Sequence, residues 1–387
     1  MPAYDDIITS ALIYPSVASA AISGALVMTK SFHGKFSLDS QVGVQKFHTA
    51  PTPRIGGIAL FGSLVVAFLL TGKATGGLLG LMIIAGFPAF LSGIIEDLTK
   101  RVGVRERLLA TIFSGVLAIL ITGYKLDYID VPGVDSLFSY SAVAIAFTAF
   151  AVGGVANAIN IIDGFNGLAG GVLMICFGMM GLIAFQAGDM QLVNLCLILV
   201  VCVAGFMLLN FPFGKIFMGD GGAYFMGFML AWTAVLLPMR NSQVSPWSSI
   251  VVCAYPIIET VVSMIRRSWN HTGSGQADSA HLHSLIKINI IRRFFPDVPQ
   301  YYRNAMVSPV CWLLTLVFSF PAFIFYHETK MLMLSALGAF VLYILIYHGV
   351  AFLESSRPAQ TSVNESGETE KKNQRSFCKH DKALSHI

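Results

Sequence analysis

The polar residues with the clearest spacing form the run Asn157-Ala-Ile-Asn160-Ile-Ile-Asp163, which is followed by a Gly-Phe-Asn166-Gly turn. At about 100° per residue, Asn157, Asn160 and Asp163 fall within an arc of about 120°, so on a helix they line one face. The run could serve only for hydrogen bonds between helices, with a glycine-rich turn after it. Because a carboxylate on that face needs a partner, we favour a binding or catalytic face.

Three further carboxylates stand at the ends of apolar segments, namely the adjacent pair Glu96-Asp97 and Asp220 within Met-Gly-Asp-Gly-Gly. Glu96 and Asp97 could form i, i+4 ion pairs with Lys100 and Arg101. Adjacent carboxylates nevertheless repel each other and are costly to desolvate, which a divalent cation or a functional proton would offset. Asp220 could cap a helix, or it could bind Mg²⁺, which proteins usually hold with one or two carboxylates plus substrate oxygens.

Imidazole and cationic side chains occur in two further segments. Lys46, His48 and Arg54 precede a Gly-Gly pair in a proline-stiffened stretch, where they could bind a lipid phosphate or snorkel to the membrane surface. His281 and His283 lie in a basic loop that could simply be solvated surface. Their i, i+2 spacing could chelate zinc, but no third ligand stands at a familiar spacing. Imidazoles among basic residues suit diphosphate oxygens better.

The elements that carry these residues must be membrane helices. The chain has 387 residues, of which 55% are hydrophobic and only 12% are charged, and its mean hydropathy is +0.70, which excludes a water-soluble globule. We expect an all-α polytopic membrane protein with about 11 transmembrane helices. The apolar segments fall at 7–29, 55–72, 76–95, 108–123, 138–156, 168–187, 192–209, 222–238, 247–265, 306–326 and 331–353. Five of the six cysteines lie inside them without a Cys-x-x-Cys pair, so we interpret these as small hydrophobic residues.

The basic residues are divided unequally between the connections. If the first six residues face outward, the inward connections and the tail hold 21 of the 25 Lys and Arg residues, and the outward connections hold four. This bias predicts a periplasmic N-terminus and a cytoplasmic C-terminus, with the candidate residues at the cytoplasmic face. It also accounts for the net charge of +4 without a nucleic acid partner. Residues 1–353 form the membrane domain, and the composition of 354–387 predicts a disordered cytoplasmic tail.

Taken together and in order, the motifs resemble those of the polyprenyl-phosphate N-acetylhexosamine-1-phosphate transferases, a glycosyltransferase family 4 type that includes MraY and WecA. The resemblance covers about residues 40 to 290 and rests on Pro-Thr-Pro-x-x-Gly-Gly, the acidic pair, Asn-x-x-Asn-x-x-Asp-Gly, Met-Gly-Asp and the His-x-His loop. Five ordered motifs on one membrane face are far more specific than any single motif. The segments 46–57 and 105–108 look closer to the WecA branch than to the MraY branch.

The resemblance implies transfer of a sugar 1-phosphate from a UDP-N-acetylhexosamine, UDP-GlcNAc or a related amino sugar, to undecaprenyl phosphate, with release of UMP. The reaction would start a lipid-linked glycan, such as O antigen of lipopolysaccharide, capsule or a similar cell-envelope polysaccharide, at the bacterial inner membrane. Mg²⁺ would be the cofactor, and Mn²⁺ could substitute for it. The partners would be the two substrates and membrane lipids, without nucleic acid, and a homodimer is compatible with the sequence.

The motifs also assign roles to the candidate residues. The catalytic carboxylates are Asp97, Glu96 and Asp163, and the metal ligands are Asp220 and Asp97. Adjacent helical residues point about 100° apart, so we expect Asp97 to have the stricter role and Glu96 the more tolerant one. The substrate-binding residues are Asn157, Asn160, Asn166, His281, His283, Lys46, His48 and Arg54.

The chain departs from the pattern that it resembles at four positions. The family usually has Asp where this chain has Glu96, and a second Asp where it has Asn166. It usually has Ser at the position of Ala223, and often a third His at that of Ser284. Ala223 alone lacks a polar group, so any hydroxyl role there is lost, and the change at Asn166 bears on contact with the uracil base.

A secondary transporter is the main alternative, because it would also have many helices and a few buried polar residues. Transporters place their site near the bilayer midplane on broken helices. Glu259 is the single acid in the middle of an apolar segment, and the other candidates gather at one edge. This distribution favours the transferase.

Overall fold

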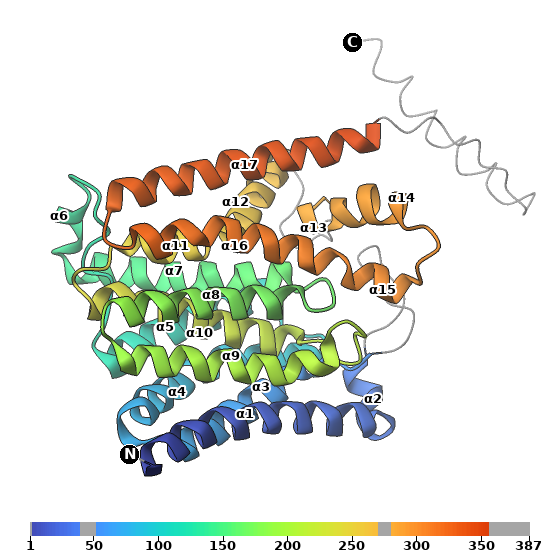
Figure 1. Ribbon diagram of the computed structural model, residues 1–387, viewed down its shortest axis with the longest axis horizontal. Helices are drawn as coiled ribbons and strands as arrows, with labels where there is room; N and C mark the ends of the chain where they lie inside the picture. The colour runs from blue at the N-terminus through green and yellow to red at the C-terminus, as the bar shows by residue number, and fades with distance from the viewer. Residues whose placement is uncertain (1, 39–51, 270–279, 356–387) are drawn as a thin grey trace, which may run out of the picture.

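The computed structural model describes residues 2–38, 52–269 and 280–355, and in those ranges the protein is almost entirely helical. The single β-type pairing within them is an isolated bridge between Leu38 and Pro53. Most of the long helices run roughly along the long axis of the molecule in Figure 1, so their ends gather at its two ends. The predicted class of all-α polytopic membrane protein is confirmed.

The helices alternate with short connections along the chain. The longer ones are α1 (Pro2–Met28), α3 (Gly56–Leu70), α4 (Lys73–Thr99), α5 (Val104–Thr122), α7 (Ser141–Ile162), α8 (Leu168–Gln186), α9 (Met190–Asn210), α10 (Gly219–Arg240), α12 (Ala254–Trp269), α16 (Val307–Phe325) and α17 (Thr329–Ser355). The shorter ones are α2 (Lys30–Ser37), α6 (Asp135–Phe138), α11 (Pro246–Val252), α13 (Leu282–Leu285), the π-helical segment η1 (Ile286–Ile291), α14 (Arg292–Phe294) and α15 (Gln300–Ala305).

Within the described ranges, seven helices are long and apolar enough to cross a membrane, and up to nine spans result if each of two bent pairs is one span. The pairs are α1 with α2, bent by 85°, and α11 with α12, bent by 75°. The apolar segment 247–265 is therefore divided, at Cys253. Pro256, which has no N–H to donate to the preceding turn, explains a break at this place. The count of eleven stays a prediction, because α3 is a shorter apolar helix and α5 begins with charged residues.

Helix α10 lies inside the bundle, and nearly all of its side chains are buried. A helix that is apolar on all sides is typical of such a position. Its first turn comes very close to α3 and α4. A Cβ on Gly93 of α4 would lie 2.5 Å from the backbone carbonyl of Asp220, and one on Gly57 of α3 would lie 2.4 Å from the nitrogen of Gly222. Only glycine permits this approach, which holds the start of α10 in a fixed place.

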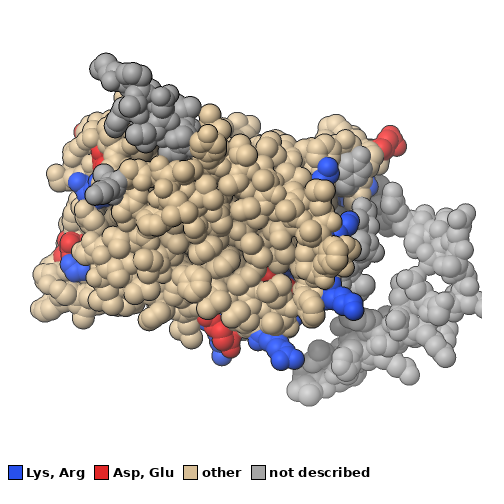
Figure 2. Space-filling view, turned by 90° about the horizontal axis from the view of Figure 1, so that it is seen from below, with Lys and Arg blue, Asp and Glu red and all other residues tan. Residues whose placement is uncertain are grey.

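The two ends of the bundle differ in side-chain chemistry. The end that carries α2, α13, α14 and α15 lies at the right of Figure 1. In Figure 2, Lys and Arg side chains lie mainly toward this same end, a few charged side chains lie at the opposite end, and a broad band with few charges lies between them. Such a band is typical of a surface that faces lipid.

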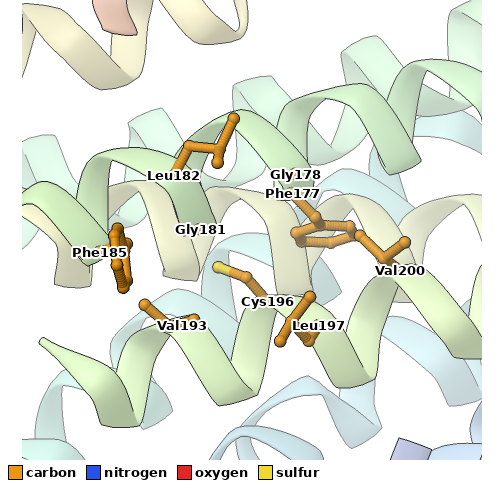
Figure 3. Close-up of a pocket in the computed structure, with 9 residues that line it drawn as sticks. All are labelled: Phe177, Gly178, Gly181, Leu182, Phe185, Val193, Cys196, Leu197 and Val200. Atoms are coloured by element: carbon orange, nitrogen blue, oxygen red, sulfur yellow. The ribbon is translucent and has the colours of Figure 1, made fainter.

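A small pocket of about 190 Å³ lies between α8 and α9 (Figure 3). It is lined by Phe177, Gly178, Gly181, Leu182, Phe185, Val193, Cys196, Leu197 and Val200. These residues offer no charged group to a nucleotide or a phosphate. This pocket is therefore not a candidate site for either group.

Candidate active site

Asp97, in the last turn of α4, caps the N-terminus of α10. Its side chain is fully buried, and its two oxygens accept hydrogen bonds from the backbone N–H groups of Asp220 (3.0 Å) and Gly221 (2.9 Å). The first four N–H groups of a helix have no partner inside it, and a carboxylate at that end is favourable. The interpretation of Asp220 as the N-cap is wrong, because Met218 occupies that position. Asp97 instead fixes the helix start that presents Asp220.

The carboxylate of Asp220 is the meeting point of polar side chains from three other segments. Its Oδ1 accepts a hydrogen bond from Asn160 Nδ2 of α7 at 2.9 Å and lies 3.5 Å from Arg54 Nη2. Its Oδ2 pairs with the guanidinium group of Arg107 in α5. Arg54 Nη2 also lies 3.8 Å from Asp97 Oδ1. Two guanidinium groups therefore converge on two carboxylates, and their charges offset each other.

The face of α7 predicted from the residue spacing is directed at α10. Asn157 Oδ1 accepts a hydrogen bond from the hydroxyl group of Tyr224 at 3.1 Å. One turn later, Asn160 binds Asp220. Both amides of α7 thus orient side chains of α10, namely Tyr224 and Asp220.

Asp163 directly follows the last residue of α7 and accepts a hydrogen bond from the backbone of Gly219. Burial raises the pKa of Asp163 to about 7, the nearby Arg54 lowers it, and the carboxylates of Asp220 and Asp97 raise it. Asp163 is therefore close to the other two carboxylates in space, although it is far from both in sequence. Near neutral pH its carboxyl group is only partly ionised.

Glu96 has different surroundings from its neighbour Asp97. Its Oε2 accepts a hydrogen bond from the backbone N–H of Val102 at 2.8 Å, and its Oε1 lies 3.8 Å from Arg107 Nη1. The two adjacent carboxylates therefore face different partners, as their angular separation on a helix requires. Asp97 turns to α10, and Glu96 turns to the connection between α4 and α5.

The two histidines belong to residues 280–291, which we name the histidine arm. The rings of His281 and His283 are nearly parallel, with centroids 5.1 Å apart. His283 Nε2 lies 3.7 Å from the place that a Cβ on Gly164 would occupy, and its ring meets Phe165 edge-on with a centroid distance of 5.5 Å. The histidine arm therefore packs on the loop that follows α7.

Asn166 makes contacts of another kind. Its side-chain Nδ2 donates a hydrogen bond to the carbonyl group of Pro212 at 2.9 Å. Its backbone carbonyl group accepts a hydrogen bond from Ser308 Oγ at 2.6 Å. These bonds join the loop before α8 to the connection before α10 and to α16. The predicted contact of Asn166 with uracil stays a prediction. The predicted contacts of Lys46 and His48, and the predicted disorder of the tail beyond Ser355, lie outside the described residues.

Two residues that contact the candidate residues were not themselves candidates from the sequence. Arg107 pairs with Asp220, and the available signal was its place among charged residues at the start of an otherwise apolar helix. Glu259 was noted only as a mid-segment acid, and the structure places its Oε1 3.0 Å from His281 Nδ1. The signal in that case was burial, because a carboxylate inside a bundle must find a partner.

Among the described residues, no three His, Cys, Asp or Glu side chains lie together as a ready-made metal site. Mg²⁺ does not require one, because it is often bound by one or two carboxylates, with substrate phosphates and water completing its shell. Asp220 fits this mode, since its carboxylate lies at the centre of the cluster. Asp97 fits it less well, because both of its oxygens accept backbone N–H groups that fix the start of α10, whereas the partners of Asp220 are side chains.

Comparison with known proteins shows which families the sequence is similar to. Residues 79–238 match the model of Glycosyl transferase family 4, a region that includes the acidic pair and most of α10. The chain is 28% identical to the probable undecaprenyl-phosphate N-acetylglucosaminyl 1-phosphate transferase of Bacillus subtilis, over 78% of this chain and 80% of that protein. It is 27% identical to the undecaprenyl-phosphate alpha-N-acetylglucosaminyl 1-phosphate transferase of Yersinia pestis, over 71% and 75%. It is 26% identical to a phospho-N-acetylmuramoyl-pentapeptide-transferase of Clostridium perfringens, over 79% and 94%.

The fold and these matches define a multi-pass membrane transferase. More narrowly, the chain is similar to the polyprenyl-phosphate hexosamine-1-phosphate transferases. Three of its motifs lie within the matched region: the acidic pair, Asn-x-x-Asn-x-x-Asp-Gly and Met-Gly-Asp.

Proposed function

We propose that the protein transfers the sugar 1-phosphate of a UDP-N-acetylhexosamine to undecaprenyl phosphate and releases UMP. An oxygen of the lipid phosphate attacks the phosphorus that bears the sugar. The bond between this phosphorus and the bridging oxygen breaks, and the bridging oxygen leaves with UMP. The product is a lipid-linked sugar diphosphate. The convergence of Arg54 and Arg107 on Asp220 is the observation that carries the proposal.

Phosphoryl transfer depends on positioning and charge neutralisation more than on covalent chemistry. Guanidinium groups suit this task, because their paired donors match the oxygens of a phosphate. The side chain of Arg54 is 27% exposed and lies only 3.5 Å from Asp220. An approaching diphosphate can therefore share the donors of Arg54. The histidine arm supplies imidazole groups beside the loop that follows α7.

Mg²⁺ would be held by Asp220, with diphosphate oxygens completing its shell. When bound, it would neutralise charge on the phosphoryl oxygens and orient them for attack. Asp97 supports this arrangement by fixing the start of α10. A direct bond from Asp97 to the metal, as the motifs predict, would have to coexist with its two hydrogen bonds. Mn²⁺ offers the same preference for oxygen ligands.

Asp163 is the carboxyl group best suited to hold or release a proton. Burial raises its pKa to about 7, which is near the second pKa of a phosphate monoester, about 6. Asp163 can therefore accept a proton from an acceptor that arrives as the monoanion. Glu96, beside Arg107, orients this guanidinium group and tolerates change more readily than Asp97.

The cluster lies at a bilayer edge, which suits a reaction between a water-soluble donor and a lipid acceptor. The division of 21 to 4 among the 25 Lys and Arg residues supports a cytoplasmic location for this edge. In a bacterial inner membrane, the protein would start a lipid-linked glycan for O antigen, capsule or a similar polysaccharide. The names of the relatives in Bacillus subtilis and Yersinia pestis favour UDP-GlcNAc as the first donor to test, ahead of related amino sugars.

The test is a reconstitution with purified full-length protein, undecaprenyl phosphate, Mg²⁺ and a panel of UDP-sugars labelled in the sugar. We expect one donor to give labelled lipid and an equal amount of UMP. The bend between α11 and α12 is a feature that a secondary transporter would share. A transporter would instead accumulate intact UDP-sugar inside vesicles and release no UMP, and that result would overturn the proposal.

A further inference from the structure

Glu259 of α12 is a buried carboxylate that the reaction described above does not use. Only 1% of its surface is exposed, and three groups donate hydrogen bonds to it or lie at hydrogen-bond distance. Its Oε1 lies 3.0 Å from His281 Nδ1 and accepts the backbone N–H of Leu282 at 3.1 Å, and its Oε2 accepts the hydroxyl group of Tyr343 at 2.9 Å. A buried carboxylate is costly unless it is paired and hydrogen-bonded. Two of its three partners belong to the histidine arm, so Glu259 serves that segment.

Helices α12 and α17 also hold the start of the histidine arm. Arg266 Nη1 and the hydroxyl group of Tyr347 both donate to the carbonyl oxygen of Ala280, at 2.6 and 3.1 Å. Hydrogen bonds therefore hold the backbone on both sides of His281, independently of its imidazole ring. A residue that also binds one ring nitrogen determines the rotation of the ring and the place of its second nitrogen.

The orientation of this ring matters because of what lies beyond it. His281 stacks on His283, which in turn contacts the loop after α7, next to Asp163. With Nδ1 directed at Glu259, Nε2 lies on the opposite side of the ring. A carboxylate that accepts the Nδ1 proton fixes the orientation of the ring, and Nε2 can then contact a phosphate oxygen, to which it donates when it carries a proton.

We propose that Glu259 is a positioning residue for the transfer reaction: it orients His281 through Nδ1, so that the second ring nitrogen faces the diphosphate. The inference rests on the proposed function. It explains why an acid stands inside an apolar segment of an enzyme, where a transporter would use it for an ion. It also gives Tyr343 a role, since the tyrosine hydroxyl group occupies the second oxygen of Glu259 and leaves the first to His281 and the backbone N–H of Leu282.

The experiment is a double-mutant cycle with steady-state kinetics on purified full-length protein. The variants are Glu259→Gln, Glu259→Asp, His281→Ala and the two double variants. Thr260→Val is the matched control, because Thr260 is the next residue of α12, is buried and bonds only the carbonyl group of Pro256 in its own helix. Melting temperature and size-exclusion profile report on folding for each variant.

We expect Glu259→Asp, which withdraws the carboxylate by roughly 1.5 Å, to lower kcat/KM about 10- to 100-fold in the His281 background. Glu259→Gln, whose carbonyl oxygen can still accept from Nδ1, should retain more activity than Glu259→Asp. Neither change should lower activity further once His281 is Ala. Losses that multiply in the double variants would overturn the inference, and so would a Gln variant no better than the Asp variant.

The same data separate this inference from the proposed function. If wild-type protein and Thr260→Val form no labelled lipid from any UDP-sugar, the proposed function fails. If both are active and the losses at Glu259 and His281 are independent, only the positioning role fails. If Glu259→Asp lowers the melting temperature equally with His281 and with His281→Ala, the change has a general effect on stability. Such an effect cancels when the kinetic losses in the two backgrounds are compared.

Discussion

The carboxylate of Asp97 accepts a hydrogen bond, 3.0 Å long, from the backbone N–H of Asp220. The two residues lie at the ends of different helices, so this bond fixes one helix against the other at the point where Asp220 is presented. Gly93 permits it, because a side chain there would collide with the backbone of Asp220. The position of the candidate metal ligand thus depends on a second acid that holds its backbone.

The roles of the acidic pair can be separated by swapping the acid lengths. Asp97→Glu moves the carboxylate by roughly 1.5 Å in a site with no free space, so it should lose most of its kcat and about 1 kcal/mol of stability, as expected for a lost helix cap. Glu96→Asp should retain much of its kcat, because Glu96 bonds a loop and lies 3.8 Å from a guanidinium group that Asp220 also holds. Steady-state kinetics and thermal unfolding of both variants decide this. The opposite ranking would mean that the two roles are reversed.

Asp220→Asn tests the centre of the cluster. Asn160 can still donate to the remaining oxygen, so the fold should persist, but the charge that pairs with Arg107 is lost. We expect kcat to fall at least about 100-fold, in keeping with the loss of a preorganised charge at a transferring phosphoryl group. Asp297→Asn is the control, because Asp297 is an exposed acid in the connection between α14 and α15. A normal rate for Asp220→Asn at ordinary Mg²⁺ would show that Asp220 has no part in the reaction.

Asp163 should make both stability and activity depend on pH. Its pKa is raised by burial from the ordinary value of 3.8 to about 7, so the folded state favours the neutral acid. The wild-type protein should therefore lose stability relative to Asp163→Asn as pH rises from about 4 to about 7. Thermal unfolding without divalent cations at pH values from 5 to 8 measures this. A constant difference between the two proteins would contradict the raised pKa.

A rise of kcat/KM with pH near pH 7, which we call the activity limb, is a separate expectation. If ionised Asp163 accepts the proton, kcat/KM of the wild type should rise through about pH 7, and the variant should lose this limb and most of the activity. A limb near pH 6 that remains in the variant would belong to the acceptor phosphate.

The topology can be tested by cysteine labelling. The five described native cysteines are buried, so replacement of Cys378 gives a background with little reactivity. A membrane-impermeant maleimide added to intact spheroplasts should label a cysteine at the exposed position of Gln243 and miss one at Gly273. The reverse pattern would place the site at the outer face and contradict a reaction with cytoplasmic UDP-sugars.

Much of the site could be predicted from local patterns, because membrane helices are marked by apolar runs and their ends by polar residues. The face of Asn157, Asn160 and Asp163 followed from helical periodicity alone. The contact of Asp97 with the start of α10 could not be predicted, because it joins residues more than 120 positions apart and depends on close helix packing at Gly93. Periodicity says which face is polar, but it does not say which helix that face meets.

The partners of Arg107 and Glu259 were missed for a related reason. A basic residue at a helix end satisfies the topology rule without any ligand, so composition gave no reason to pair Arg107 with Asp220. Glu259 required a partner on physical grounds, but that partner lies in a loop beyond residues 270–279. The break at Cys253 was missed because the apolar run continues through it, although Pro256 was a local signal.

The most direct measurement uses UDP-GlcNAc labelled with ³²P at the phosphorus that bears the sugar. Wild-type protein in undecaprenyl phosphate micelles with Mg²⁺ should move this label into the lipid and release unlabelled UMP in equal amount, and Asp220→Asn should do so far more slowly. If the label stays in the aqueous phase as UDP while sugar alone enters the lipid, the bond that breaks is not the diphosphate bond. That result would contradict transfer of a sugar 1-phosphate.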